Sequence, residues 1–133
     1  MAEILLGSHV GMSGKEMFLG SVKEAESYGA NVLMVYTGAP QNTRRKEIGE
    51  LRIDEGISYA EKAGIREIVI HAPYIINLGN MEKPEMFDFG VEFLAKEVKR
   101  AAAFHSKVLV LHPGSSLSAG VEASVEQIAK GLN

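Results

Sequence analysis

Three of the four histidines in the chain, His9, His71 and His112, each follow a short run of apolar, β-favouring residues. If these runs are parallel strands, their carboxyl ends meet at one edge of the sheet, where binding and catalytic groups gather. Imidazole is a common neutral ligand of zinc-like ions. The three histidines together therefore indicate a metal or phosphate site, although each one alone would be read as a hydrogen-bonded structural residue.

Two of these histidines lie beside prolines, in His71-Ala72-Pro73 and in His112-Pro113-Gly114. Proline restricts its own backbone and that of the residue before it, so either turn could hold an imidazole ring in one orientation. A plain strand-terminating turn is the alternative. The fourth histidine, His105, falls between a predicted helix and the strand that follows it. We expect it at the opposite edge, as a structural or solvated residue.

The strongest cluster of positive charge is Arg44-Arg45-Lys46, preceded by Gln41 and Asn42. It follows the second apolar run and should lie at the same edge as the histidines. These cations could neutralise backbone phosphates, with the two amides as hydrogen-bond partners. A solvated loop carrying three cations is the alternative.

Apolar side chains also follow His71, at Tyr74, Ile75 and Ile76, where a solvent-facing loop is expected. Apolar side chains at such a place can wedge into a nucleic-acid stack. They could equally pack beneath the loop.

These residues need a scaffold, and the hydropathy pattern predicts one of alternating strands and helices. A Ser13–Glu16 capping box predicts the start of the first helix, and Gly29 and Gly64 are placed to end the first two. The expected strands are residues 4–6, 31–36, 67–70 and 107–111, and the expected helices lie around 17–25, 54–63, 87–101 and 125–132.

Four consecutive β-α units with apolar strands predict an α/β fold with a parallel sheet covered by helices. The spacing is typical of a TIM (β/α)₈ barrel, which needs about 250 residues to close. The 133 residues would supply about half a barrel, and we expect residues 1–133 to form a single domain. An open doubly wound sheet is the competing fold, but its glycine-rich dinucleotide loop is missing.

Composition limits the function classes without selecting one. Cysteine is absent, which excludes disulfides and thiolate metal sites, so any metal must use His, Asp or Glu. No apolar run approaches the roughly 18 residues that cross a membrane, and the N-terminus does not resemble a signal peptide, so we expect a cytoplasmic protein. The net charge of −3 does not point to nucleic acid, but a local basic patch could still contact phosphates.

Four ordered sequence blocks resemble successive motifs of the endonuclease IV family, and the resemblance extends over essentially the whole chain. The blocks are Gly7-Ser8-His9-Val10 with Met12-Ser13-Gly14-Lys15, the run from Tyr36 to Lys46 (YTGAPQNTRRK), the run from His71 to Gly79 (HAPYIINLG), and Leu111-His112-Pro113-Gly114.

The resemblance implies a TIM barrel that hydrolyses the DNA phosphodiester 5′ to an abasic site, with three zinc ions at the C-terminal rim. His71 and His112 match the first two zinc ligands of the family, and His9 matches a position near the site. The loop from Gln41 to Arg45 and the pair Tyr74-Ile75 match segments that grip double-stranded DNA and enter it at the lesion.

The chain also departs from the family pattern. Ser116 stands where many members carry histidine, Phe104-His105-Ser106 replaces a usual Leu-Gly-containing turn, and the remaining metal ligands have no counterpart. Two histidines do not fill a tetrahedral zinc site. We therefore expect a truncated portion that is inactive or weakly active. The alternatives are a non-enzymatic half-barrel that binds DNA or associates through its exposed edge and, ranked lower, a metal-dependent sugar isomerase or epimerase.

Overall fold

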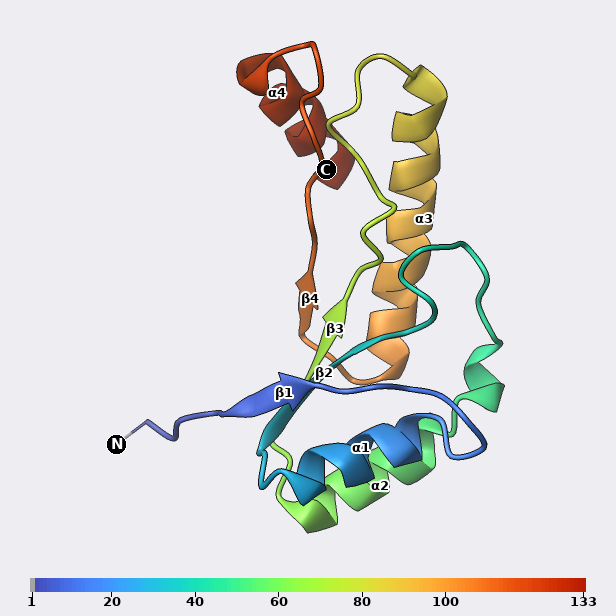
Figure 1. Ribbon diagram of the computed structural model, residues 1–133, viewed down its shortest axis with the longest axis vertical. Helices are drawn as coiled ribbons and strands as arrows, with labels where there is room; N and C mark the ends of the chain where they lie inside the picture. The colour runs from blue at the N-terminus through green and yellow to red at the C-terminus, as the bar shows by residue number, and fades with distance from the viewer. Residues whose placement is uncertain (1) are drawn as a thin grey trace.

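The computed structural model describes residues 2–133, in which four strands alternate with four α-helices (Figure 1). The strands are β1 (Gly7–His9), β2 (Val32–Tyr36), β3 (Glu67–His71) and β4 (Val108–Val110). The helices are α1 (Phe18–Ser27), α2 (Ile53–Ala63), α3 (Pro84–Ala103) and α4 (Val121–Leu132), with a short 3₁₀ helix, η1 (Ile48–Glu50), before α2. None of the helices in these residues has a stretch long and apolar enough to cross a lipid bilayer.

The four strands form one sheet in the order β1-β2-β3-β4, and every neighbouring pair is parallel. Tyr36, the last residue of β2, pairs with His71, the last residue of β3. His71 pairs in turn with Val110, the last residue of β4. The predicted parallel α/β arrangement is therefore confirmed, and the carboxyl ends of β2, β3 and β4 lie level.

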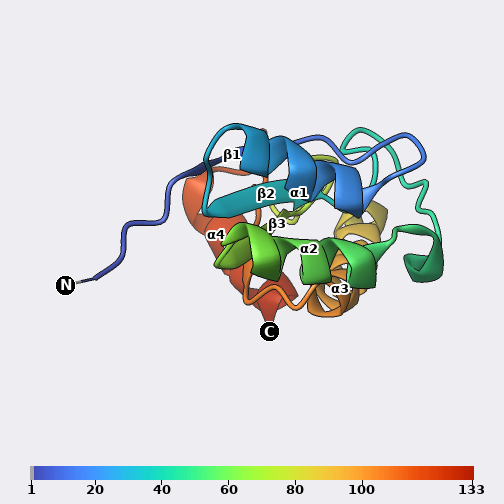
Figure 2. The same cartoon turned by 90° about the horizontal axis from the view of Figure 1, so that it is seen from below.

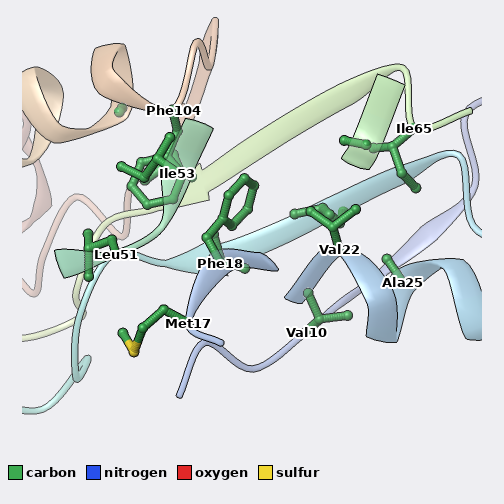
Figure 3. Packing of buried hydrophobic residues seen from close by; sticks show 14 residues of the cluster. Val10, Met17, Phe18, Val22, Ala25, Leu51, Ile53, Ile65 and Phe104 are labelled. Atoms are coloured by element: carbon green, nitrogen blue, oxygen red, sulfur yellow. The ribbon is translucent and has the colours of Figure 1, made fainter. Parts of the chain in front are cut away.

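The larger core cluster lies between the sheet and the paired helices α1 and α2, which run side by side (Figures 1 and 2). Phe18 is fully buried, and its ring meets that of Phe104 edge-on at a centroid distance of 4.8 Å (Figure 3). A Cβ added at Gly56 of α2 would lie 2.4 Å from the Phe18 ring. The close approach of the two helices therefore depends on glycine at this position.

A second cluster lies beneath the loop that follows β3. Ala72, Ile76 and Leu78 of this loop pack against Phe93 and Leu94 of α3. Ile76 is thus buried, so only part of the apolar run after His71 remains at the surface. This packing holds the polypeptide that follows His71 against the outer helix.

Two local predictions are wrong. The first strand begins at Gly7 rather than at Ile4, because β2 offers a pairing partner only from Val32, and the Asn31 side chain accepts the Leu6 N–H. The predicted Ser13–Glu16 capping box does not form. Ser13 instead makes an antiparallel bridge with Met17, and α1 begins one residue later without a side-chain cap.

The other helix boundaries follow the predicted pattern closely. Gly64 ends α2 with φ of 78°, a left-handed conformation that glycine adopts without steric cost. Helices α3 and α4 each begin a few residues earlier than their apolar stripes suggest, and Pro84 occupies the first turn of α3. Proline suits that position because the first helical N–H groups have no intrahelical acceptor.

Candidate functional site

Three histidines and a tyrosine meet at the carboxyl edge of the sheet. His9 ends β1, Tyr36 ends β2, His71 ends β3, and His112 lies two residues beyond β4. The His71 and His112 rings are stacked with centroids 5.0 Å apart, and His9 lies 6.0 Å from His71. The Tyr36 ring contacts both neighbours, at 4.7 Å from His9 and 4.8 Å from His71. The structure therefore brings together the three histidines selected from the sequence.

The environment of these rings suits neutral imidazole. His71 is buried, and its Nδ1 lies 2.6 Å from the Ala72 carbonyl oxygen. Because a carbonyl can only accept, Nδ1 is the donor of this bond, which in a neutral ring leaves Nε2 with its lone pair, the arrangement found behind metal-bound histidines. Partial burial, with a smaller contribution from His71, lowers the pKa of His9. His9 therefore stays neutral to lower pH than an unperturbed histidine.

The donor set at this edge suits a metal but is incomplete. Within residues 2–133, no group of three His, Cys, Asp or Glu side chains is gathered tightly enough to hold a metal ion. His71 and His112 can serve as two imidazole ligands of a zinc-like ion, which takes four ligands in most sites. A zinc-like ion held by these two imidazoles would need further ligands.

Asn77 ties the loop that carries His112 to the loop that follows His71. Its side-chain oxygen accepts the Gly79 and Ser115 N–H groups, each at 3.0 Å. A Cβ added at Gly114, where φ is 131°, would lie 2.2 Å from the same oxygen. The Leu78 N–H also donates to the Pro113 carbonyl at 3.2 Å. The separation of His71 and His112 is therefore set by contacts between their loops as well as by the strands.

The cationic loop (residues 37–46) lies beside this edge, following Tyr36. Gln41 and Arg44 are exposed, and the Asn42 side chain accepts the Arg44 N–H at 2.9 Å. Arg45, in contrast, points inward. Its Nε donates to Glu97 of α3 at 2.7 Å, with the two side chains only 10% and 0% exposed. The three cations that look equivalent in the sequence thus occupy different environments.

A pocket of about 610 Å³ separates the cationic loop from the segment between β1 and α1. Met12 and Met17 line one side, and Asn42, Arg44 and Lys46 line the other. On the loop after β3, Tyr74 is 54% exposed and Ile75 is half-buried. His105 lies at the other end of the sheet, exposed and with φ of 56°.

Glu97 and Tyr36 also belong to this region, although the sequence pattern did not single them out as site residues. Tyr36 could have been found from its position, because it ends a strand just as His9 and His71 do. Glu97 carries a signal in its spacing. Phe93, Leu94 and Ala101 are buried on α3, and position 97 falls on the same face at intervals of three and four residues. An acidic residue within an apolar helix face indicates a buried partner of opposite charge.

Comparison with known proteins places these features in a family. Residues 22–133 match the family described as xylose isomerase-like TIM barrel. The chain is 62% identical over 128 residues to the probable endonuclease 4 of Lachnoclostridium phytofermentans, an alignment that covers 96% of this chain and 43% of the relative. It is 55% identical to the probable endonuclease 4 of Bacillus subtilis, with the same shares covered.

Solved structures agree on the fold. Endonuclease IV from Thermus thermophilus superposes with a TM-score of 0.76 at 28% identity, covering 96% of this chain and 46% of that one. A D-tagatose 3-epimerase-like protein gives a TM-score of 0.63 at 20% identity, which shows the shared fold alone. The predicted TIM barrel fold is confirmed, and the parallel sheet is about half of such a barrel. The chain spans less than half the length of the relatives it matches.

We expect replacement of Asn77 by alanine to loosen the loop that carries His112. The Gly79 and Ser115 N–H groups would lose their shared acceptor, at a cost of roughly 1–2 kcal/mol in the free energy of unfolding. Urea denaturation measures this loss, and amide hydrogen exchange should show faster exchange at Ser115.

Asn80→Ala is the matched control, because the Asn80 side chain accepts only from the nearby Glu82 and Lys83 N–H groups. It should leave exchange at Ser115 unchanged. Equal exchange at Ser115 in wild type and Asn77→Ala would contradict the bracing role.

Proposed function

The chain belongs to the xylose isomerase-like TIM barrel family and matches its endonuclease 4 members over nearly its whole length, and we propose on this premise that it is the N-terminal half of an endonuclease IV-type repair nuclease. The proposed reaction is hydrolysis of the DNA phosphodiester 5′ to an abasic site. The observation that carries the proposal is the convergence of His71 and His112 beside the cationic loop.

His71 and His112 are proposed as zinc ligands. The proton on Nδ1 of His71 leaves Nε2 available for a metal, and neutral imidazoles keep a metal cluster positive enough to receive a phosphodiester. Zinc held by His71 and His112 would supply a water that ionises near neutral pH and would stabilise negative charge on phosphate oxygens. His9, stacked at 6.0 Å from His71, is proposed to shape the site from the β1 side without ligating the metal.

The DNA contacts are proposed for the two loops beside the histidines. Gln41, Asn42 and Arg44 lie on the cationic loop, where exposed amide and guanidinium groups suit backbone phosphates. Arg45 contributes through the loop that its buried side chain organises. Tyr74 and Ile75 offer apolar surface near His71, suited to a base stack opened at the lesion. A sugar isomerase would have no use for the cations of this loop, so we rank that alternative lower.

The isolated chain is proposed to be inactive or weakly active. Only two of the converging side chains are assigned as ligands, and two imidazoles hold zinc weakly and leave most of its coordination to water. In a complete barrel the other strands would add ligands at the same rim. DNA binding by the loops can therefore be tested separately from zinc binding and hydrolysis in this chain.

A second candidate role, self-association, is favoured by the outer strand of the sheet. β4 pairs with β3 on one side, and Val108 and Val110 are 46% and 38% exposed. On the neighbouring helix α4, Val121 and Val125 are 70% and 56% exposed. An exposed strand edge with apolar side chains favours pairing with another chain, and a second copy would cover it.

We expect zinc to bind weakly to the wild-type chain and at least about tenfold more weakly to the His71→Ala and His112→Ala variants, because each loses an imidazole ligand. Titration calorimetry with zinc alone measures the affinity. His105→Ala is the control, since His105 lies at the opposite end of the sheet, and it should bind like wild type. Robust incision of an abasic-site duplex by the isolated chain with added zinc would contradict the claim of low activity.

We expect Arg44→Ala to weaken binding to an abasic-site duplex and to lower the slope of log K against log salt by about 1, the value for one lost phosphate contact. Fluorescence anisotropy at several salt concentrations measures both quantities. Arg66→Ala is the matched control, because Arg66 precedes β3 at the opposite edge and is also exposed. An equal loss in both variants would show non-specific attraction rather than a contact by the cationic loop.

We expect the wild-type chain to associate as its concentration rises, and Val108→Lys to shift it towards monomer, because a lysine on an edge strand opposes pairing. Sedimentation velocity across a range of concentrations measures the species present. A single monomeric species of the wild-type chain at every concentration would argue against a role in self-association.

A further inference from the structure

Glu97 is a fully buried carboxylate in the middle of α3, and the proposed chemistry gives it no task. One side-chain oxygen accepts from Arg45 Nε at 2.7 Å, and the other accepts from the Thr37 hydroxyl at 2.8 Å. Removing a charge from water is costly unless the charge is paired and hydrogen-bonded, and both conditions are met here. The partners of Glu97 are residues of the cationic loop, so this loop is what the buried charge holds.

The cationic loop is folded around the Arg45 guanidinium. Nη1 of Arg45 donates to the carbonyl oxygens of Ala39, Asn42 and Arg44, at 3.1, 3.1 and 2.7 Å. The guanidinium also lies 4.9 Å from the centroid of the Phe93 ring. A Cβ at Gly38 would come within 2.6 Å of the Arg45 side chain, so glycine leaves room for it. One side chain thus gathers the loop and fastens it to α3.

Arg100, one helical turn beyond Glu97, fixes both ends of the same loop. Its Nη2 and Nε donate to the Thr37 carbonyl and hydroxyl oxygens, at 2.8 and 2.9 Å, and its Nη1 donates to the Lys46 carbonyl at 2.9 Å. The first and last residues of the cationic loop are therefore held by one guanidinium. Helix α3 therefore contacts the loop through Arg100, at Thr37 and Lys46, and through Glu97, at Thr37 and Arg45.

The Glu97–Arg45 ion pair also affects which of the three consecutive cations, Arg44, Arg45 and Lys46, are presented at the surface. Arg45 is turned inward to Glu97, whereas Arg44 and Lys46 on either side of it are exposed. Arg44 and Lys46 line the 610 Å³ pocket between the cationic loop and the β1–α1 segment, and so does part of the Arg45 side chain. The buried ion pair thus decides which cations face a ligand and keeps a preformed pocket next to them.

We infer that Glu97 and Arg45 are positioning residues for DNA binding, which hold the cationic loop in a single conformation with Arg44 and Lys46 presented to backbone phosphates. This inference rests on the proposed function and adds a role for two residues remote from the histidines. A loop that is already ordered loses less conformational entropy when it binds, so its affinity is higher than that of a mobile loop with the same charges.

The test compares Glu97→Gln with wild type in the full chain. Glutamine keeps the shape of the side chain but removes the charge opposite Arg45. Amides of residues 38–46 should exchange about tenfold faster, and trypsin should cleave faster after Arg44 and Lys46. Affinity for an abasic-site duplex should fall about three- to tenfold, with the salt slope unchanged because no exposed cation is lost.

Glu92→Gln is the matched control. Glu92 lies on the same helix and pairs with Lys96 at 2.7 Å, but both side chains are exposed, so no change in loop exchange or DNA affinity is expected. Zinc titration separates positioning from general damage to the fold, because Glu97→Gln should bind zinc like wild type. Equally weakened zinc binding and faster exchange throughout the chain would overturn the inference.

The double variant Glu97→Leu with Arg45→Met covers the case in which a single change prevents folding. An apolar pair of similar volume often replaces a buried ion pair without loss of stability. The double variant should fold, exchange faster at residues 38–46 and bind the duplex more weakly. Wild-type loop protection in both variants would overturn the inference. Faster loop exchange with unchanged duplex affinity would also overturn the inference. If the wild-type chain does not bind the duplex at all, the proposed function is refuted, but the effect of Glu97 on loop exchange still holds.

Discussion

The parallel hydrogen-bond ladder of the sheet is the constraint on which the rest of the structure depends. It sets Tyr36 beside His71 and His71 beside Val110, and so brings the ends of three strands to one level. Each residue proposed for binding lies in the last position of a strand or in the loop directly after it. A shift of one residue in the register of any strand pair would place the ring on the opposite face of the sheet, because side chains alternate between faces.

The strands alone do not fix the loops, and two polar braces complete the arrangement. Asn77 joins the loops after β3 and β4, and the Glu97–Arg45 pair joins the loop after β2 to α3. In both braces a polar side chain makes hydrogen bonds to groups that are distant in the sequence. In the part of the chain that the structure describes, no buried side-chain nitrogen or oxygen is left without a hydrogen-bond partner. Fully satisfied networks of this kind favour one loop conformation over its alternatives.

The chain has a closed core on one side of the sheet and an exposed outer strand, β4. This difference underlies both proposed roles, DNA binding at the rim and self-association through β4. The cluster around Phe18 is closed by α1, α2 and the sheet, while β4 and α4 expose several valines. A chain covering 43% of its endonuclease 4 relatives has the scaffold for one side of a TIM barrel and the loops at its rim. The binding surfaces proposed for that rim use residues within the chain, whereas the proposed zinc site would need ligands beyond His71 and His112.

Periodicity and spacing determined most of the architecture. Apolar runs separated by amphipathic helices predict the four β-α units, because a buried parallel strand and a half-buried helix have different repeats. The same reasoning placed His71 and His112 at one edge, since strand ends in a parallel sheet share a side. The sequence also indicated the cationic loop and its location, and the four motif blocks indicated the family.

Only the tertiary structure decided what depends on partners far away in the sequence. The start of β1 was set by where β2 can pair, and the Ser13–Glu16 cap was lost to a bridge between Ser13 and Met17. Arg44 and Arg45 cannot be told apart by type or local spacing. Glu97 separates them from 52 positions away, because its buried carboxylate pairs with the Arg45 guanidinium and holds it inward, while Arg44 stays exposed.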